Sequence, residues 1–133
     1  MLYTKNMISF NNRFHGHSSL NYVYKNGQAV RSHSVTVKYV TNPHRQQSRI
    51  AVVISKKTLK SAVRRNQIRR RIYEYARLKL PALIGVYDIA IIVTASDFIN
   101  LTHAEMTQQI DQLFDQAKIT SKTKTPKTVP KNP

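Results

Sequence analysis

Three stretches of the chain have the hydrophobic pattern of β-strands. In residues 34–40 polar and apolar side chains alternate, as on a strand with one buried face and one solvated face. Residues 49–54 form a continuous, largely β-branched apolar run that follows a polar, turn-forming segment. Residues 86–93 form a second such run. Continuous apolar runs of this kind are typical of strands in the interior of a sheet.

A short helix is predicted before the first of these strands. Ser18 or Ser19 can act as its N-terminal cap, because a serine hydroxyl accepts a hydrogen bond from the free N–H groups of the first turn. The apolar face of this helix would consist of Leu20, Val23 and Tyr24. We expect Gly27 to end the helix in the left-handed conformation, which glycine adopts at little cost.

Two longer helices are predicted in the second half of the chain. From about residue 61 apolar residues recur at helical spacing, and Pro81 should end this helix because proline disfavours helical geometry in the preceding residue. Its core-facing stripe contains Ala62, Ile68, Ile72, Tyr75 and Ala76. Thr102 and Glu105 have the spacing of a capping box at the start of the last helix. The apolar face of that helix contains Met106, Ile110, Leu113, Phe114 and Ala117.

The order of these elements predicts a single α/β domain. Only a loop separates the first two strands, whereas a helix connects the second to the third, so we expect a mixed sheet with helices packed on it. Residues 17–118 would form this domain, after an irregular N-terminal segment formed by residues 1–16. Residues 119–133 are rich in lysine, threonine and proline, a composition that predicts a disordered basic tail.

The net charge narrows the choice of partners. The 133 residues include 22 Lys and Arg against 6 Asp and Glu, which gives a formal net charge of +16. Such an excess repels itself in the folded state and favours a polyanionic partner, with nucleic acid ahead of an anionic membrane surface. No apolar run approaches the roughly 20 residues that span a bilayer, and the N-terminal residues lack the pattern of a signal peptide. The absence of cysteine fits a reducing, cytoplasmic location.

Positive charge is densest in residues 56–71, in the first turns of the second helix and the loop before it. Helical spacing places several polar side chains on a common face, away from the apolar stripe. This face contains Arg65, Asn66, Arg69 and Arg70, its flanks contain Arg64 and Arg71, and the loop contains Lys56, Lys57 and Lys60. Guanidinium groups bind phosphate through paired hydrogen bonds, and asparagine can bond a sugar or a base edge. Charge alone leaves other interpretations open, because solvated helices, ribosomal proteins, DNA-binding helices and membrane-surface helices share it.

The order of residues in this basic stretch resembles the signature of the bacterial ribonuclease P protein subunit. Ser55-Lys56-Lys57 precede Ala62 and then Arg65-Asn66-Gln67-Ile68-Arg69-Arg70, where the family usually reads Arg-Asn-Arg-Ile-Lys-Arg. The resemblance runs in the same order from about Arg13 to Ile119, through Arg13-Phe14, the spacing of Leu20, Val23, Tyr24 and Gly27, and Asp88 before an apolar strand. The chain departs from the family pattern at Leu20, Gln67, Tyr73 and Thr94.

This resemblance implies an α/β sandwich with a left-handed βαβ crossover that contains the arginine-rich helix. It also implies the small subunit of a ribonucleoprotein endoribonuclease, which cuts precursor tRNA to form the mature 5′ end. The catalytic RNA would perform the hydrolysis, with Mg²⁺ bound mainly by that RNA and the substrate. The protein would be monomeric within the complex and bind the catalytic RNA and the 5′ leader, with no membrane involved. The alternative is a non-catalytic RNA- or DNA-binding protein, such as a ribosomal protein.

The resemblance further assigns residues to two binding surfaces. Contacts to RNA would come from Arg13, Lys56, Lys57, Lys60, Arg64, Arg65, Asn66, Arg69, Arg70 and Arg71. A cleft for the single-stranded leader would be lined by Leu20, Tyr24, Val35, Val37 and Tyr39. For the cleft a second interpretation is open, because Tyr24 suits core packing equally well and the two valines suit it better.

No catalytic pattern is visible in the chain itself. Its six acidic residues are scattered, and no pair has the spacing of a two-metal site. Asp111 and Asp115 lie one turn apart, but we expect a solvated pair on the exposed face of the last helix. His15 and His17 lack further ligands nearby, which favours a surface loop over a metal site. We therefore expect no catalytic residue in the protein and assign no metal ligand.

Overall fold

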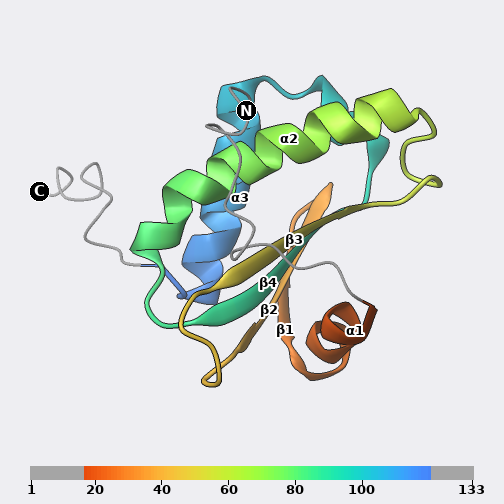
Figure 1. Cartoon of the computed structure of the whole chain (residues 1–133). Helices are drawn as coiled ribbons and strands as arrows, with labels where there is room; N and C mark the ends of the chain where they lie inside the picture. Colours follow the sequence, from red (N-terminus) through yellow and green to blue (C-terminus); the bar gives the residue numbers. More distant parts are fainter. Residues whose placement is uncertain (1–16, 121–133) are drawn as a thin grey trace, which may run out of the picture.

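The computed structural model describes residues 17–120, which contain three α-helices, four β-strands and two short 3-10 helices (Figure 1). In chain order the elements are α1 (His17–Asn26), β1 (Gln28–Arg31), β2 (Val35–Thr41), β3 (Arg49–Ile54), α2 (Ala62–Lys79), η3 (Leu80–Ala82), β4 (Tyr87–Val93), η4 (Ser96–Asn100) and α3 (His103–Ala117). The predicted N-terminal segment, with Arg13, and residues 121–133 of the predicted tail lie outside the described residues.

The four strands form one mixed sheet in the order β1-β2-β4-β3. The pairs β1–β2 and β2–β4 are antiparallel, whereas β3 and β4 are parallel. Parallel neighbours need a crossover connection, and α2 supplies it between β3 and β4. This arrangement confirms the mixed sheet and the βαβ unit expected from the sequence. It also places the apolar strand β4 inside the sheet, between β2 and β3.

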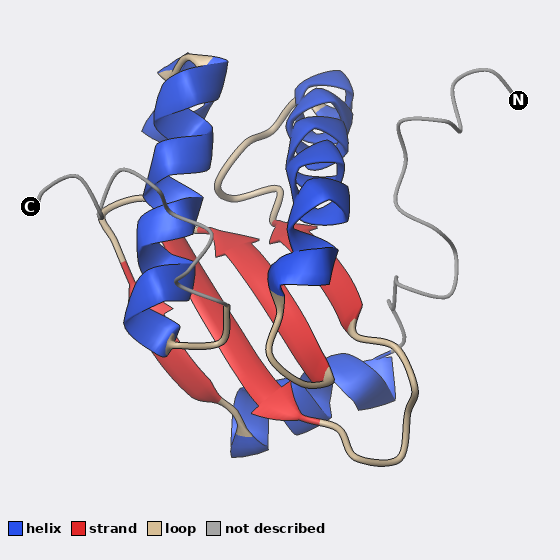
Figure 2. Ribbon diagram, turned by 90° about the vertical axis from the view of Figure 1, so that its left-hand side faces the viewer, coloured by secondary structure: helices blue, strands red, loops and turns tan. Residues whose placement is uncertain are grey.

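Helices cover both faces of this sheet. Figures 1 and 2 show α2 and α3 side by side on one face, with α1 on the other. The face under α2 and α3 carries the larger side chains of the core: Val35, Val37, Ile50, Val52, Ile54, Ile89, Ile91 and Val93. On the opposite face Ala51 and Ala90 are register partners, and the buried Val23 of α1 packs against them. Two adjacent alanines leave room for α1 to lie close to the sheet.

A buried ion pair holds the end of the sheet where β3 and β4 begin. Arg49 donates from Nε to Asp88 Oδ1 at 3.0 Å and from Nη2 to Oδ2 at 2.7 Å. Asn42, just after β2, donates to the same Oδ2 at 2.8 Å. The Asp88 side chain is only 5% exposed, so these hydrogen bonds replace the water that it loses on folding.

Polar contacts join α2 to α3. The Tyr75 hydroxyl donates a hydrogen bond to Asp111, and Lys79 Nζ lies 2.9 Å from Asp111 Oδ1. The Tyr75 ring also meets Phe114 edge-on. Burial, and then the bond to Asp111, raises the pKa of the Tyr75 phenol far above its ordinary value, so the phenol remains a donor. Asp115 is exposed, as predicted for the solvated pair. For Asp111, whose side chain is 42% exposed, that prediction was wrong, because Asp111 links the two helices.

The local sequence signals located most of these elements. Residues 49–54 form β3 as predicted, and β2 and β4 each begin one residue later than predicted. Ser61 caps α2, and the Thr102–Glu105 capping box of α3 is present with both hydrogen bonds. The cap predicted for α1 was wrong, because this helix begins at His17 and Ser18 and Ser19 lie inside it. The strand β1 was not predicted.

Gly27 ends α1 for a reason other than the one expected. Gly85 is the only glycine with a positive φ among the described residues, so Gly27 is not left-handed. Instead, a Cβ atom at Gly27 would lie 2.6 Å from the carbonyl oxygen of Val23 and 2.8 Å from that of Tyr39. Glycine is required here because the end of α1 touches the backbone of β2.

We expect Gly27→Ala to lower the free energy of unfolding by about 1–3 kcal/mol, the usual cost of overpacking. The clash involves backbone atoms, which cannot rotate away as a side chain would. Urea unfolding would measure the loss, with Lys25→Ala on the exposed side of α1 as the control, for which a change within about 0.5 kcal/mol is expected. Equal losses for the two variants would contradict the close approach.

The domain extends past the boundary predicted at residue 118. Ile119 is 1% exposed and Thr120 is 5% exposed, so both are buried. Ile84 donates its backbone N–H to the Ile119 carbonyl at 2.8 Å, and Leu83 forms a β-bridge with Thr120. These two residues were assigned to the disordered tail, and that boundary was wrong. Ile119 is the one apolar residue among polar and basic neighbours at this point of the sequence, and it packs into the core just after α3.

Candidate nucleic-acid-binding surfaces

The basic helix α2 is fixed to the sheet along one side. The Ser61 hydroxyl accepts a hydrogen bond from the Arg64 N–H at 3.2 Å, and Ile68 and Ile72 are buried in the core. Tyr73, one of the positions that depart from the family pattern, is also buried, and its hydroxyl accepts a hydrogen bond from the Val52 N–H at 3.2 Å. Since β3 is an edge strand of the sheet formed by residues 17–120, Tyr73 pairs with a backbone N–H that no strand in this range reaches.

The side of α2 that faces away from the sheet carries Asn66, Arg69 and Arg70, which we call the outer flank. Arg69 Nη1 donates to Asn66 Oδ1 at 2.6 Å, so the amide orients one guanidinium of this flank. Asn66 and Arg70 are exposed. The structure thus brings together three of the four residues predicted to share a face. Their positive charge is presented to solvent on a rigid helix.

Arg65, the fourth of these residues, turns toward the protein. Its Nη1 atom donates to the carbonyl oxygens of Leu59 and Lys60, each at 2.9 Å. At the other end of this loop, the Ser55 carbonyl oxygen accepts a hydrogen bond from the Leu59 N–H at 3.0 Å. Within the described structure, Arg65 therefore orders the loop that displays Lys56, Lys57 and Lys60, all of which are exposed.

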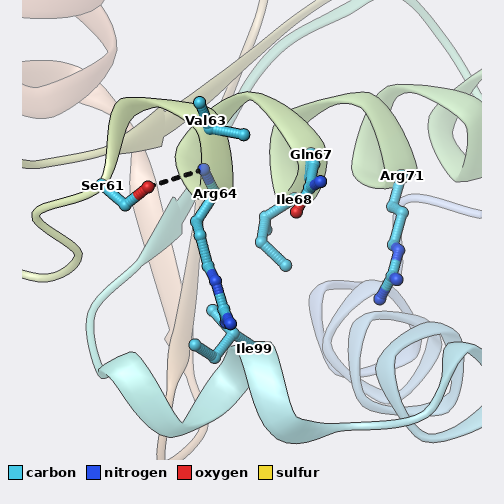
Figure 3. A pocket seen from close by; sticks show the side chains of 7 residues that line it. All are labelled: Ser61, Val63, Arg64, Gln67, Ile68, Arg71 and Ile99. Atoms are coloured by element: carbon cyan, nitrogen blue, oxygen red, sulfur yellow. Dashed lines mark hydrogen bonds between the residues drawn. The ribbon is translucent and has the colours of Figure 1, made fainter.

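Arg64 and Arg71 lie on the opposite flank of α2, beside η4. Figure 3 shows their side chains descending from the helix on either side of Ile68, with the Arg64 guanidinium close to Ile99. The groove between α2 and η4 has a volume of about 430 Å³. It is lined by Ser61, Val63, Arg64, Gln67, Ile68, Arg71 and Ile99. Sequence reasoning placed these two arginines on flanks but missed the groove, because η4 was not predicted.

The predicted leader cleft is divided by the sheet. Val35 and Val37 are both 0% exposed and lie in the core under α2 and α3, so their assignment to the cleft was wrong. Tyr39 follows the same alternation, and its ring meets Tyr87 edge-on. Leu20 and Tyr24 belong to α1, on the other face. Side chains of one strand point alternately to the two faces, which separates the predicted residues.

Lys38 is the strand residue that joins Tyr24 on the α1 face. Its Nζ atom donates to the Tyr24 carbonyl at 3.0 Å and lies 5.4 Å from the centre of the tyrosine ring. The Tyr24 side chain is still 36% exposed, and partial burial raises the pKa of its phenol. Proteins that bind single-stranded nucleic acid combine these two groups: a base stacks on the aromatic ring, and the positive charge attracts the phosphate backbone. The alternation in residues 34–40 could have predicted this, because it places Lys38 on the face opposite to that of Val37 and Tyr39.

Within residues 17–120 no three histidine or acidic side chains are grouped so that they could hold a metal ion. Over the same residues, no helix has the length and apolar character needed to cross a membrane.

A small α/β domain with a cationic helix on one side and a lysine-flanked aromatic ring on the other has the features of a nucleic-acid-binding protein. The family model for Ribonuclease P matches residues 9–118, and the chain belongs to this family. It is 34% identical over 77 residues to the ribonuclease P protein component of Synechococcus sp. (strain WH7803), a match that covers 58% of this chain and 57% of the relative. The match to the component from Chloroflexus aggregans has 34% identity over 80 residues and covers 60% and 57%. The matched part thus spans little more than half the length of these relatives.

Solved structures show the same fold. The chain resembles the RNase P protein of Staphylococcus aureus with a TM-score of 0.74 and 23% identity, covering 83% of this chain and 98% of that one. It resembles the RNase P protein of Thermotoga maritima with a TM-score of 0.69 and 20% identity, covering 78% and 96%. The expected family and the expected small α/β fold are both confirmed.

Proposed function

We propose that this chain is the protein subunit of a ribonuclease P ribonucleoprotein, which matures the 5′ ends of tRNA. The outer flank of α2 carries this proposal: the exposed Asn66 and Arg70 and the half-buried Arg69, which Asn66 orients, form a cationic face on a domain of this family. In α2 as a whole only Glu74 opposes the arginines and lysines. This face would bind phosphates of the catalytic RNA, together with Lys56, Lys57 and Lys60 of the neighbouring loop.

The α1 face would bind the 5′ leader of precursor tRNA. Tyr24 and Lys38 offer stacking and charge there, and Leu20 extends the apolar surface. The two proposed surfaces lie on different sides of the sheet, so one protein can hold the catalytic RNA and the leader at the same time. The contribution of the protein is then positioning and neutralisation of phosphate charge, in a complex with one copy of the chain.

Hydrolysis would belong to the RNA subunit, with Mg²⁺ bound mainly by the RNA and the substrate. The outer flank itself does not suit this ion, because Mg²⁺ takes oxygen ligands and guanidinium groups have none to offer. The amide oxygen of Asn66 already accepts the hydrogen bond from Arg69. We therefore propose no metal step on the protein.

Reconstitution with a bacterial-type catalytic RNA tests this function. At low Mg²⁺ concentration the purified full chain is expected to increase cleavage of precursor tRNA over RNA alone, because it supplies charge that Mg²⁺ otherwise provides. A basic protein of another fold, matched in net charge, serves as the control. If cleavage is no faster than with that control, the chain is instead a non-catalytic nucleic-acid-binding protein.

We expect Tyr24→Ala to weaken binding of leader-containing precursor tRNA by about 1–3 kcal/mol, the value of one base–aromatic stack. Tyr24→Phe should retain most of the affinity, because the ring and its contact with Lys38 remain. Fluorescence polarisation with precursor and with mature tRNA measures the effect. A reduction of the same size for mature tRNA would place the contact elsewhere than on the leader.

A further inference from the structure

The groove between α2 and η4 differs in composition from the outer flank of the same helix. Its inner wall is apolar, with Ile68 5% exposed and Ile99 half-buried beside it. The guanidinium groups of Arg64 and Arg71 border this wall, and Arg64 reaches across to η4 (Figure 3). A surface that bound phosphate alone would need the arginines but not the apolar wall. The combination fits a ligand with both a flat apolar part and negative charge.

The charges of this groove are uncompensated within the described structure. Neither arginine takes part in an ion pair there, and none of the seven lining residues is acidic. The nearest acid in the sequence of η4, Asp97, pairs with His33 at 2.8 Å. Charge complementarity therefore favours an anionic occupant, and guanidinium groups favour phosphate.

The spacing along α2 fits one nucleotide. Arg64 and Arg71 are two helical turns apart, about 10 Å along the axis, and Gln67 lies between them. Along the helix the groups follow the order guanidinium, amide, guanidinium. In Figure 3 the Gln67 amide lies near Ile68, and the Arg64 guanidinium lies beside Ile99. A nucleoside with a phosphate on each side presents the matching order of groups.

Gln67 determines which base fits. An arginine at this position would offer only donors. A glutamine amide offers one donor and one acceptor side by side, which matches N7 and the N6 amino group of adenine. Because Gln67 is exposed at the groove, its amide is available for this contact.

We propose that the α2–η4 groove binds one unpaired adenosine nucleotide of RNA. The base lies against Ile68 and Ile99, its edge meets Gln67, and the flanking phosphates meet Arg64 and Arg71. That the nucleotide belongs to an RNA chain rests on the proposed function. The contact adds recognition of a base to the phosphate contacts of the outer flank.

Methyl NMR of the full chain, labelled at the isoleucine δ1 methyl groups, tests the site. Titration with adenosine 3′,5′-bisphosphate is expected to shift the Ile68 and Ile99 signals, while Ile89 and Ile110 in the core remain in place. The uridine analogue should bind at least about fivefold more weakly, the lower limit for one amide–adenine pair. Shifts confined to other methyl groups, or equal affinity for both nucleotides, would overturn the proposal.

Gln67→Met removes the amide and retains a side chain of similar length. It is expected to abolish the preference for adenosine and to lower affinity for the catalytic RNA about fivefold, since the amide can no longer pair with the base in either ligand. Binding of the bisphosphate with unchanged RNA affinity in this variant would show that the occupant is not part of the RNA, and would refute that assignment.

A variant of the outer flank distinguishes the nucleotide site from the proposed function. Arg69→Ala combined with Arg70→Ala should weaken RNA binding but leave the bisphosphate titration unchanged. If reconstitution enhances cleavage while Ile68 and Ile99 do not respond, the nucleotide site is wrong and the function stands. If those methyl groups respond without any enhancement of cleavage, the function is wrong and the groove still binds the nucleotide.

Discussion

Asp88→Ala is expected to lower the free energy of unfolding by about 3–5 kcal/mol, the usual cost of removing one member of a buried ion pair. Three hydrogen bonds from Arg49 and Asn42 converge on this carboxylate. Without it, the Arg49 guanidinium, whose side chain is 13% exposed, keeps its charge and loses its counter-ion. Urea unfolding followed by circular dichroism would measure the change.

The cause of this destabilisation can be isolated with a second variant. If the penalty arises from loss of the Arg49–Asp88 charge pair, combining Asp88→Leu with Arg49→Met should cost less than Asp88→Ala alone. Asp97→Ala, which removes the 54% exposed partner of His33, is the matched surface control and should change stability by less than about 1 kcal/mol. A double variant as unstable as Asp88→Ala would show that Asp88 acts through shape or hydrogen bonding to Asn42 instead.

Elements defined by neighbouring residues were predictable from the sequence. A cap, a proline or a run of apolar residues acts within one or two turns, so Ser61, the Thr102–Glu105 box and residues 49–54 all indicated the correct element. The strand β1 has only four residues and exists because it pairs with β2. Its sequence has no pattern of its own, and only the tertiary partner defines it.

The two surfaces were predictable to different degrees. Helical spacing is enough to group Asn66, Arg69 and Arg70, since all three belong to one rigid helix. The α1 face required knowing which side of β2 the helix α1 covers. Alternation separates Val37 from Lys38 but does not say which of them faces α1. That choice depends on Ala51 and Ala90, which admit α1 on their side of the sheet.

The direction of long charged side chains was the least predictable feature. Arg65 and Arg69 are four residues apart on one helix, yet one binds loop carbonyls and the other binds Asn66. The difference arises because Arg65 lies in the first turn, where the loop that leads into α2 folds back beside the helix. Spacing within the helix contains no information about that loop.

The second large effect is expected at the outer flank. Arg69→Ala combined with Arg70→Ala should weaken binding of the catalytic RNA by about 1.5–3 kcal/mol per arginine, the usual range for hydrogen bonds to charged groups. The slope of log K against log salt concentration should fall by about 0.7–0.9 for each phosphate that the variant no longer neutralises, because fewer counterions are released on binding. Filter binding between about 50 and 200 mM salt, a range over which proteins that contact phosphates lose much of their affinity, gives both quantities.

Arg45→Ala provides the matched control for this experiment, because it removes the same charge from an exposed position in the loop between β2 and β3. If binding depends on the position of charge on α2, this variant should leave the slope unchanged. If Arg45→Ala lowers the slope as much as the removal of one outer-flank arginine, affinity follows the net charge of +16 and not one face.

The hydrogen bond between Asn66 and Arg69 allows a further test, since Asn66→Ala would release the Arg69 guanidinium without changing the net charge. A weaker affinity with an unchanged slope in that variant would show that the flank acts through oriented contacts as well as through charge.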